Sequence, residues 1–222
     1  MGRRLFGTAL TSLLAPLWLA GPAWAEVVPV RIVLLGDSYI ASYGVDSGHR
    51  FEEQLEAALN ANGPLVQVVG TGYTSTSFKG VEHLKSLLES EDDLGGNGPK
   101  AVILELGSND CARYKLEETQ ASLDAILKSL AGRHIPVLVV GTTPYTGCER
   151  KDRPNYKALY VQMFADLADR YGNLYYRDFK EGVGGHPELM QGDHDHPTAK
   201  GDAVIVAKML PVVEELVARA QP

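Results

Sequence analysis

The chain has 222 residues, of which 45% are hydrophobic, and its 28 acidic and 21 basic side chains give a formal net charge of −7. This length and composition indicate a globular protein with a sizeable core and exclude a low-complexity or disordered chain. The acidic balance disfavours nucleic acid and anionic membrane surfaces as partners, so we expect a small, neutral partner molecule.

The first 25 residues show the pattern of a cleaved secretory signal peptide. Two arginines precede an apolar run over 5–20, and the small-x-small sequence AWA follows at 23–25. This order predicts export and cleavage after Ala25. A transmembrane anchor, the alternative, needs about 20 unbroken apolar residues, and glycines and prolines interrupt this run. We therefore expect a periplasmic or secreted bacterial protein without a stable membrane anchor.

Cleavage would leave 26–222 as one domain, long enough to form a core that needs no stapling. The removed segment carries two arginines and no acidic residue, so the net charge of the mature part becomes −9. The remaining sequence contains no internal repeat or inter-domain linker, which also favours a single domain.

Short apolar runs alternate with longer amphipathic segments along the mature sequence. The run KAVILELG is uninterrupted, which is typical of a strand buried on both faces of a parallel sheet. Strands are expected at 28–36, 65–70, 100–107, 135–141 and 173–179. Helices are expected where apolar residues recur at helical spacing, at 50–63, 79–89, 117–131, 154–171 and 198–219. This alternation predicts an α/β fold with a central parallel sheet of about five strands and helices on both faces.

Sites in open α/β sheets form at the carboxyl ends of the strands, so we expect the chemistry in the loops that follow each strand. These loops read GDSYIAS (36–42), GTGYTSTS (70–77), GSNDC (107–111), GTTPYTGC (141–148) and, before the last helix, GDHDHP (192–197). The dinucleotide-binding fingerprint is incomplete, because Ser75 stands at its third glycine. There is no GxxxxGK[ST] phosphate loop, and the G-x-S-x-G nucleophile elbow has Ile40 at its fifth position.

The segment GDHDHP offers two aspartates and two histidines, all of which can bind a metal ion. Together with GDS and GSND it superficially matches the metallophosphoesterases, which use GD, GNHD and GHxH segments. Those enzymes also need an early D-x-H and a histidine in the middle motif. Here the middle motif at 107–110 has no histidine, and no D-x-H precedes Gly36. We therefore expect no metal site.

Ser38 follows the first buried strand and is a candidate nucleophile, provided that a base accepts its proton and a third group orients the base. Gly-Asp-Ser is also ordinary turn chemistry, so the motif alone leaves both interpretations open. Four blocks occur in a fixed order: GDS at 36–38, a glycine-containing turn at 70–75, GxND at 107–110 and DxxHP at 193–197. In this order they resemble the SGNH (GDSL-type) serine hydrolases over nearly all of the mature chain.

The resemblance is closest to the bacterial arylesterase, acyl-CoA thioesterase and lysophospholipase group, through phrases such as VILELG-ND, IPVL and HP-A-G. It implies a three-layer α/β/α, flavodoxin-like fold and no metal or organic cofactor. Two departures are visible. Tyr39 replaces the leucine of GDSL, and the second block is one residue shorter than the family form N-A-G-x-S-G-D-T.

The resemblance assigns the reacting groups residue by residue. Ser38 would be the nucleophile, His196 the general base and Asp193 the acid that orients the base. Asp37 and Asp110 are expected to brace the loops by hydrogen bonding.

The resemblance also implies an oxyanion hole. It would consist of the Ser38 backbone N–H, the Asn109 side-chain amide and an N–H from the second block. Gly72 is expected to supply this last N–H, with Thr74 and Ser75 as alternatives.

The two cysteines of the chain are expected to pair. An even number of cysteines in an exported protein favours a disulfide. Cys111 follows the third block and Cys148 follows the fourth expected strand, which should neighbour the third. We therefore expect a Cys111–Cys148 disulfide at the rim of the site. A catalytic cysteine is the alternative, although neither residue has a recognisable nucleophile context.

Aromatic residues cluster in the same loops. Tyr39, Tyr73 and Tyr145 are expected to contact the substrate, and Tyr43 and Phe78 lie near them in the sequence. The cluster has two interpretations, which are ordinary packing and an apolar groove for the acyl or aryl part of an ester.

The sequence thus predicts an exported serine esterase that hydrolyses lipid or aryl esters, or thioesters, through an acyl-enzyme on Ser38. The main alternative is a carbohydrate O-acetyl esterase or acetyltransferase with the same triad. A more remote alternative is a non-catalytic exported binding protein of the same fold. The expected partner is a small ester molecule. The sequence does not determine the oligomeric state, and it is compatible with a monomer.

Overall fold

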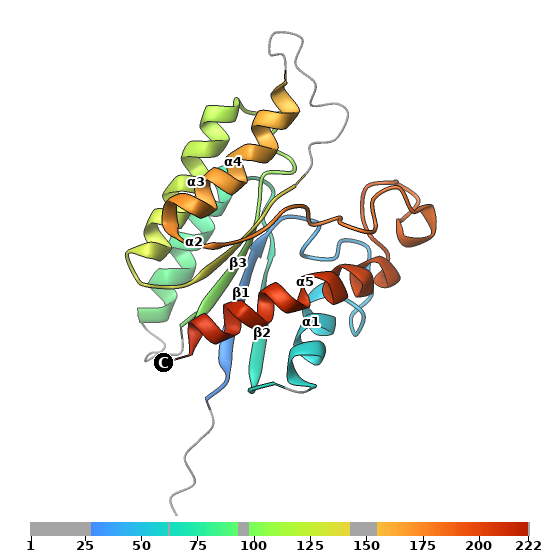
Figure 1. The fold of residues 1–222 in the computed structure, drawn as a ribbon, viewed down its shortest axis with the longest axis horizontal. Coiled ribbons are helices and arrows are strands. Elements are labelled where there is room, and N and C mark those ends of the chain that lie inside the picture. Colours follow the sequence, from blue (N-terminus) through green and yellow to red (C-terminus); the bar gives the residue numbers. More distant parts are fainter. Residues whose placement is uncertain (1–27, 62, 93–97, 143–154, 222) are drawn as a thin grey trace, which may run out of the picture.

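The computed structural model describes residues 28–61, 63–92, 98–142 and 155–221, and the expected signal peptide lies outside these ranges. The described residues form a five-stranded sheet covered by helices (Figure 1). The strands are β1 (Val30–Gly36), β2 (Val66–Tyr73), β3 (Ala101–Glu105), β4 (Val137–Val140) and β5 (Leu174–Tyr176). The helices are α1 (Phe51–Asn60), α2 (Ser77–Asp92), α3 (Leu116–Ala131), α4 (Tyr156–Tyr171) and α5 (Ala199–Ala220), with a short 3-10 helix at Pro187–Leu189.

The strands run parallel in the order β2-β1-β3-β4-β5. This is the flavodoxin-like order, in which the chain leaves β1 toward one edge of the sheet and later continues from β3 toward the other. The expected α/β fold with a parallel sheet of five strands is therefore confirmed. The reversal falls between β1 and β3, so the loops that follow these two strands meet at their carboxyl ends.

Helices cover both faces of the sheet and make three layers. In Figure 1, α2, α3 and α4 lie on one side of the sheet, and α1 and α5 lie on the other. The helices are amphipathic at a spacing of three and four residues. In α1, for example, Phe51, Leu55 and Leu59 are buried. Acidic residues occupy its first turn, where their negative charge interacts favourably with the helix dipole.

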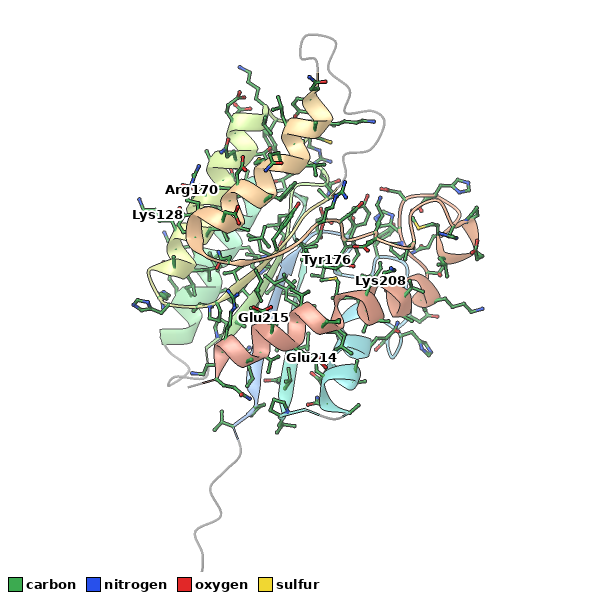
Figure 2. All side chains as sticks on the ribbon, viewed as in Figure 1. Lys128, Arg170, Tyr176, Lys208, Glu214 and Glu215 are labelled. Carbon is green, nitrogen blue, oxygen red and sulfur yellow. The ribbon has the colours of Figure 1, made fainter. Side chains whose placement is uncertain are left out.

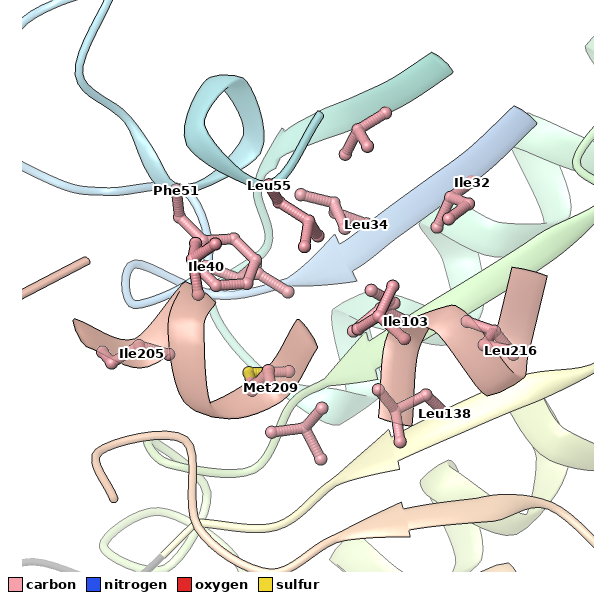
Figure 3. Close-up of a cluster of buried hydrophobic side chains, with 14 of the residues drawn as sticks. Ile32, Leu34, Ile40, Phe51, Leu55, Ile103, Leu138, Ile205, Met209 and Leu216 are labelled. Atoms are coloured by element: carbon pink, nitrogen blue, oxygen red, sulfur yellow. The ribbon is translucent and has the colours of Figure 1, made fainter. Parts of the chain in front are cut away.

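The core has two parts, one on each face of the sheet. Alternate side chains of β1 point to opposite faces, so Ile32 and Leu34 join one cluster while Val33 and Leu35 join the other. All four are at most 1% exposed. Figure 3 shows the first cluster, where side chains from the sheet, α1 and α5 meet, among them Met209. Burial of both faces explains why these strands are continuously apolar.

Charged side chains lie on the outer surface of the helical layers (Figure 2). Lys128 on α3 and Arg170 on α4 are exposed. The Arg170 Nη1 atom lies 2.6 Å from Asp124 Oδ1, which links the two helices at their surface. None of the helices in the described ranges is long and apolar enough to cross a membrane.

Candidate active site

The GDS segment forms a tight turn directly after β1. Gly36 ends the strand, and a Cβ at this position would lie 2.1 Å from Ile40 Cγ2 and 2.8 Å from the Glu105 carbonyl oxygen, so only glycine fits. The Tyr43 N–H donates to the Ser38 carbonyl oxygen at 3.0 Å, which closes the turn. Ser38 is half-buried at the carboxyl end of the sheet.

The GSND segment follows β3, the neighbour of β1, and its turn is held by hydrogen bonds. Gly107 has a φ of 122°, and a Cβ there would approach the Phe164 ring at 3.1 Å. The Tyr160 hydroxyl donates to the Gly107 carbonyl oxygen at 2.7 Å, and the Asp110 N–H donates to the same oxygen at 3.0 Å. Helix α4 thereby fixes the turn that presents Asn109.

Two buried aspartates join the three blocks. Asp37 accepts hydrogen bonds from the Ser108 hydroxyl and, at 3.3 Å, from Asn109 Nδ2. Asp110 accepts bonds from the hydroxyl and the backbone N–H of Ser77, the first residue of α2, which follows the second block. Burial raises the pKa of both carboxyls above their ordinary value. Both act as internal acceptors, which agrees with the bracing role expected from the sequence.

A third carboxyl lies beneath this turn. Glu105 ends β3, is fully buried, and accepts the Asp37 N–H at 3.4 Å. Burial and the neighbouring Asp37 charge hold the pKa of Glu105 well above its ordinary range. Glu105 was not predictable from the sequence, because a single glutamate at a strand end carries no signal of a buried carboxyl pair.

The structure brings Ser38, His196 and Asp193 into one chain of hydrogen bonds. His196 Nε2 lies 2.9 Å from Ser38 Oγ, and His196 Nδ1 lies 2.7 Å from Asp193 Oδ2. The segment leading into α5 therefore lies against the loop that follows β1, although 158 residues separate the serine from the histidine. The side chain of His196 is 16% exposed and that of Asp193 is 43% exposed.

Asp193 also accepts two backbone hydrogen bonds within the loop that carries His196. Its Oδ1 atom accepts the Asp195 N–H at 3.0 Å and the His196 N–H at 3.1 Å. The hydrogen bond from Asp195 is the main cause that lowers the pKa of Asp193 to about 2, with further contributions from His196. Asp193 is therefore charged at any pH near neutrality and faces His196 Nδ1 as an acceptor.

The donors expected for an oxyanion differ in the hydrogen bonds that they already make. One N–H of the Asn109 amide is bound to Asp37, which orients the side chain and leaves the other N–H for a ligand. In the second block, the Thr74 N–H donates to the Gly36 carbonyl oxygen at 3.0 Å, so this group is already occupied. Gly72 is exposed within β2 and has a φ of 78°. The structure gives the Ser75 N–H no acceptor among the described residues.

Tyr39 is buried and presents little exposed surface. It is 4% exposed and packs parallel to the Phe179 ring at 6.1 Å. Its hydroxyl donates to Asp195 Oδ1 at 2.5 Å and accepts from Lys180 Nζ at 2.8 Å. Burial, followed by the hydrogen bond to Asp195, holds the pKa of Tyr39 far above its ordinary value.

Lys180 and Asp195 were missed by sequence reasoning. Lys180 Nζ lies 2.9 Å from Asp195 Oδ1. Partial burial opposes ionisation of Asp195, but hydrogen bonds from Tyr39 and Lys180 outweigh it and lower its pKa. The available signal was the coincidence of two features, a polar aromatic in place of the usual leucine at Tyr39 and a second aspartate in GDHDHP.

The two aspartates of GDHDHP thus face different partners. Asp193 contacts the histidine, Asp195 contacts Tyr39 and Lys180, and His194 is exposed with a φ of 59°. In the part of the chain that the structure describes, no group of three or more His, Cys, Asp or Glu side chains is arranged to hold a metal ion.

The roles expected for the other aromatic and cysteine residues of the site stay predictions. Tyr73 is the last residue of β2. Tyr145 and Cys148 lie outside the described residues, so the disulfide and the contact of Tyr145 with substrate stay predictions. Cys111 is buried at 3% exposure, directly after the GSND turn.

An apolar groove opens along the helices that follow the second and third blocks in the chain. It has a volume of about 450 Å³ and lies between α2 and α3. Phe78, which follows the Ser77 that binds Asp110, is 56% exposed at this groove, and its ring lies 6.3 Å from that of Tyr114. The remaining lining residues are Val81, Glu82, Glu118, Ala121, Ser122 and Ala125.

Comparison with known proteins gives the family. Residues 34–204 match the model of the GDSL-like Lipase/Acylhydrolase family, a range that extends from β1 into α5. Esterase TesA of Pseudomonas aeruginosa is 26% identical over 194 residues, which cover 83% of this chain and 88% of TesA.

Solved structures agree with this assignment. A crystal structure of TesA has a TM-score of 0.73 at 25% identity and covers 84% of this chain and 99% of that chain. AlinE4, an SGNH-hydrolase family esterase, has a TM-score of 0.67 at 31% identity, with coverage of 84% and 96%. The psychrotrophic esterase EstA from Pseudoalteromonas sp. shares the fold, with a TM-score of 0.71 at 21% identity and coverage of 85% and 99%.

The resemblance to SGNH hydrolases that the four blocks predict is therefore confirmed. Because the family model covers more than half of the chain, the chain belongs to the GDSL-like lipase/acylhydrolase family and is a carboxylic ester hydrolase.

Proposed function

We propose that this enzyme is an exported serine esterase that forms an acyl-enzyme on Ser38. The observation that carries the proposal is the position of His196, whose Nε2 lies 2.9 Å from Ser38 Oγ and whose Nδ1 lies 2.7 Å from Asp193 Oδ2. A serine hydroxyl becomes an effective nucleophile only when a base accepts its proton and a third group orients that base.

In the acylation step, Ser38 Oγ attacks the ester carbonyl carbon and its proton passes to His196 Nε2. Asp193, charged because its pKa lies at about 2, stabilises the imidazolium that forms. His196 then gives this proton to the leaving oxygen as the bond between that oxygen and the acyl carbon breaks. The alcohol departs, and the acyl group remains on Ser38.

In the deacylation step, water attacks the acyl carbon while His196 accepts its proton. The bond to Ser38 Oγ breaks, the serine recovers a proton from His196, and the carboxylic acid leaves. The cycle is balanced with ester and water alone, so the proposal includes neither a metal nor an organic cofactor.

The oxyanion of both tetrahedral intermediates would accept hydrogen bonds from the Ser38 N–H and from Asn109 Nδ2. Asp37 supports this role of Asn109, because it holds the amide in one orientation before substrate binds. A third donor would come from the second block, where we retain Gly72 and keep Ser75 as its alternative. The Thr74 N–H is occupied by the Gly36 carbonyl oxygen.

We infer that the substrates are carboxyl esters of low polarity, with lipid or aryl esters first and thioesters next. The apolar groove lined by Phe78 and Tyr114 supports this class, because it offers an apolar surface along α2 and α3, the helices that follow the second and third blocks in the chain. A thioester would react by the same route, with a thiol as the leaving group.

We further propose that residues 1–25 direct export, that residues 26–222 form a single domain, and that Cys111 pairs with Cys148. Burial of Cys111 next to the GSND turn supports a clamp at the rim of the site. All groups proposed to react lie in one chain, so a monomer suffices for catalysis.

A fluorophosphonate probe tests the serine mechanism directly. We expect the wild-type protein to be labelled stoichiometrically, and Ser38→Ala to be neither labelled nor active while its circular dichroism spectrum stays unchanged. Ser86→Ala, at an exposed position on α2, is the matched control and should be labelled like the wild type. Turnover by Ser38→Ala would contradict the assignment.

A substrate panel then tests the ester class. We expect turnover of short- and medium-chain aryl and lipid esters, and weak or no turnover of acetylated sugars. A preference for acetylated sugars would instead identify a carbohydrate O-acetyl esterase that uses the same triad.

A further inference from the structure

Tyr43 is an exposed aromatic residue whose ring lies against His196, the proposed general base. Its side chain is 64% exposed, yet its ring centroid is 5.1 Å from that of His196, at an interplanar angle of 49°. A single exposed aromatic on a protein surface needs no explanation. An exposed aromatic in contact with the group that transfers the proton belongs to the surface that a substrate meets.

The backbone of Tyr43 is held on both sides. Its N–H donates to the Ser38 carbonyl oxygen at 3.0 Å, and its carbonyl oxygen accepts from Gln191 Nε2 at 2.6 Å. The same Gln191 nitrogen lies 2.8 Å from the carbonyl oxygen of Pro197, the residue after His196. Tyr43 is therefore attached both to the turn of the nucleophile and to the loop of the base.

The turn before Tyr43 is anchored in the core. Ser42 has a φ of 51°, and its buried hydroxyl donates to Asp202 Oδ2 at 2.7 Å and accepts the Phe51 N–H at 2.7 Å. Because this backbone is fixed from three directions, the ring of Tyr43 is presented at a defined place beside His196. A ring whose backbone is ordered before binding loses little conformational entropy when a ligand covers it.

The proposed reaction determines which half of the ester lies beside the ring of Tyr43. His196 returns its proton to the leaving oxygen, so the alcohol half must lie beside the imidazole. The carbonyl oxygen would face Asn109, the proposed side-chain donor to the oxyanion. The neighbours of His196 therefore contact the alcohol half rather than the acyl half.

We propose that Tyr43 is a specificity-determining residue that stacks on an aromatic or flat apolar ring in the alcohol half of the ester. The inference rests on the proposed serine mechanism and deepens it, because it makes esters of ring-bearing alcohols the preferred ones within the proposed substrate class. Tyr39, the other tyrosine in contact with His196, is 4% exposed and offers no comparable surface.

The test compares benzyl acetate with ethyl acetate. These esters share the acyl group, and their alcohols are of similar acidity, so the ratio of their kcat/KM values reports contact with the ring and not leaving-group chemistry. We expect the wild-type ratio to favour benzyl acetate. In Tyr43→Ala this ratio should fall about tenfold, the size of one aromatic contact, because benzyl acetate loses more than ethyl acetate does.

Two further variants complete the test. Tyr43→Phe keeps the ring and should keep the wild-type ratio. Leu65→Ala removes an exposed apolar side chain (51% exposed) at the amino end of β2, the opposite edge of the sheet, and should leave both esters unchanged.

An unchanged ratio in Tyr43→Ala would overturn the inference. This holds whether both esters keep their wild-type kcat/KM or lose it equally, as a purely structural role would give. Failure of the underlying mechanism looks different, because the wild type would then resist fluorophosphonate labelling and hydrolyse neither ester.

Discussion

The hydroxyl of Tyr39 donates a hydrogen bond to Asp195 Oδ1 across 2.5 Å, which joins the residue after the serine to the residue before the histidine. Lys180 Nζ binds both partners, at 2.8 Å from the tyrosine oxygen and 2.9 Å from the carboxylate. The Tyr39 ring also contacts the His196 ring at 5.4 Å. A partly buried polar cluster therefore fixes the loop that carries His196 relative to Ser38.

Replacement of Tyr39 by phenylalanine removes this hydroxyl and keeps the ring. Hydrogen bonds to charged groups contribute about 2 kcal/mol, so we expect the free energy of unfolding to fall by about that amount in urea titration. We also expect kcat to fall about tenfold, because small displacements of a catalytic group are costly. Tyr171→Phe is the matched control. It removes a 3.0 Å bond to Asp124 between α3 and α4 and should lower stability without changing kcat.

The two aspartates of GDHDHP should differ sharply when each is changed to asparagine. Asp193→Asn replaces the acceptor that faces His196 Nδ1 with a group that can donate, so the imidazole is held in the wrong tautomer. A loss of kcat on the order of 10⁴-fold with KM nearly unchanged is expected. Asp195→Asn should cost far less, because its bonds go to Tyr39 and Lys180. Steady-state kinetics of both variants decide the matter, and the reverse ranking would contradict the assignment of the acid.

Asn109→Ala removes one proposed donor to the oxyanion. We expect kcat to fall on the order of 10²- to 10³-fold while KM changes little, because the bond forms fully only in the transition state. Asn60→Ala is the control. Its amide bonds twice to the backbone of Val66 at the other edge of the sheet, so it should lower the melting temperature and spare kcat. An Asn109→Ala enzyme with wild-type kcat would exclude this donor.

Asp202 should make the stability of the protein depend on pH. Burial raises the pKa of this carboxyl in the folded state to about 7 from an ordinary value of 3.8, although the bond from Ser42 lowers it. A raised folded-state pKa means that folding takes up a proton between these two values. The contribution of Asp202 to stability is therefore most favourable below about pH 4, declines as pH rises toward 7, and is level above.

Asp202→Asn removes this titration. The difference in unfolding free energy between the variant and the wild type should shift in favour of the variant from pH 4.5 to pH 8. Urea titrations at both values measure it, and the Ser42 hydroxyl keeps an acceptor in the asparagine carbonyl. A difference that is the same at both pH values would show that Asp202 is charged in the folded protein.

The order of strands and helices was predictable because burial on both faces leaves a plain signal in β1 and β3. Element ends were less predictable, since tertiary contacts determine them. Strand β2 continues to Tyr73, beyond the expected 65–70, because it pairs again with Gly36 after a register shift in β1. Helix α2 begins at Ser77, two residues before the expected start, where Asp110 accepts the Ser77 N–H.

The sequence also indicated the three residues that the structure joins by hydrogen bonds, Ser38, His196 and Asp193, because their motifs are local and follow strand ends. The cluster of Tyr39, Lys180 and Asp195 could not be predicted from the sequence. Lys180 is 141 residues from Tyr39 and lies in no motif, so only the fold brings its ammonium to the tyrosine. Aromatic residues in a loop likewise do not reveal which of them turn inward, and Tyr39 does so while Tyr43 does not.

The bonds that Asp37 makes to Ser108 and Asn109 have a consequence for laboratory evolution of this enzyme. A substitution of Asp37 in the GDS turn changes the orientation of the Asn109 amide, 72 positions away in the sequence. A substitution of Ser108 or Asn109 in GSND removes a hydrogen bond to Asp37, the residue before the nucleophile Ser38. Effects of changes at these two segments should therefore be strongly non-additive. Libraries that randomise residues 37 and 108 together will reach functional combinations that no succession of single substitutions passes through.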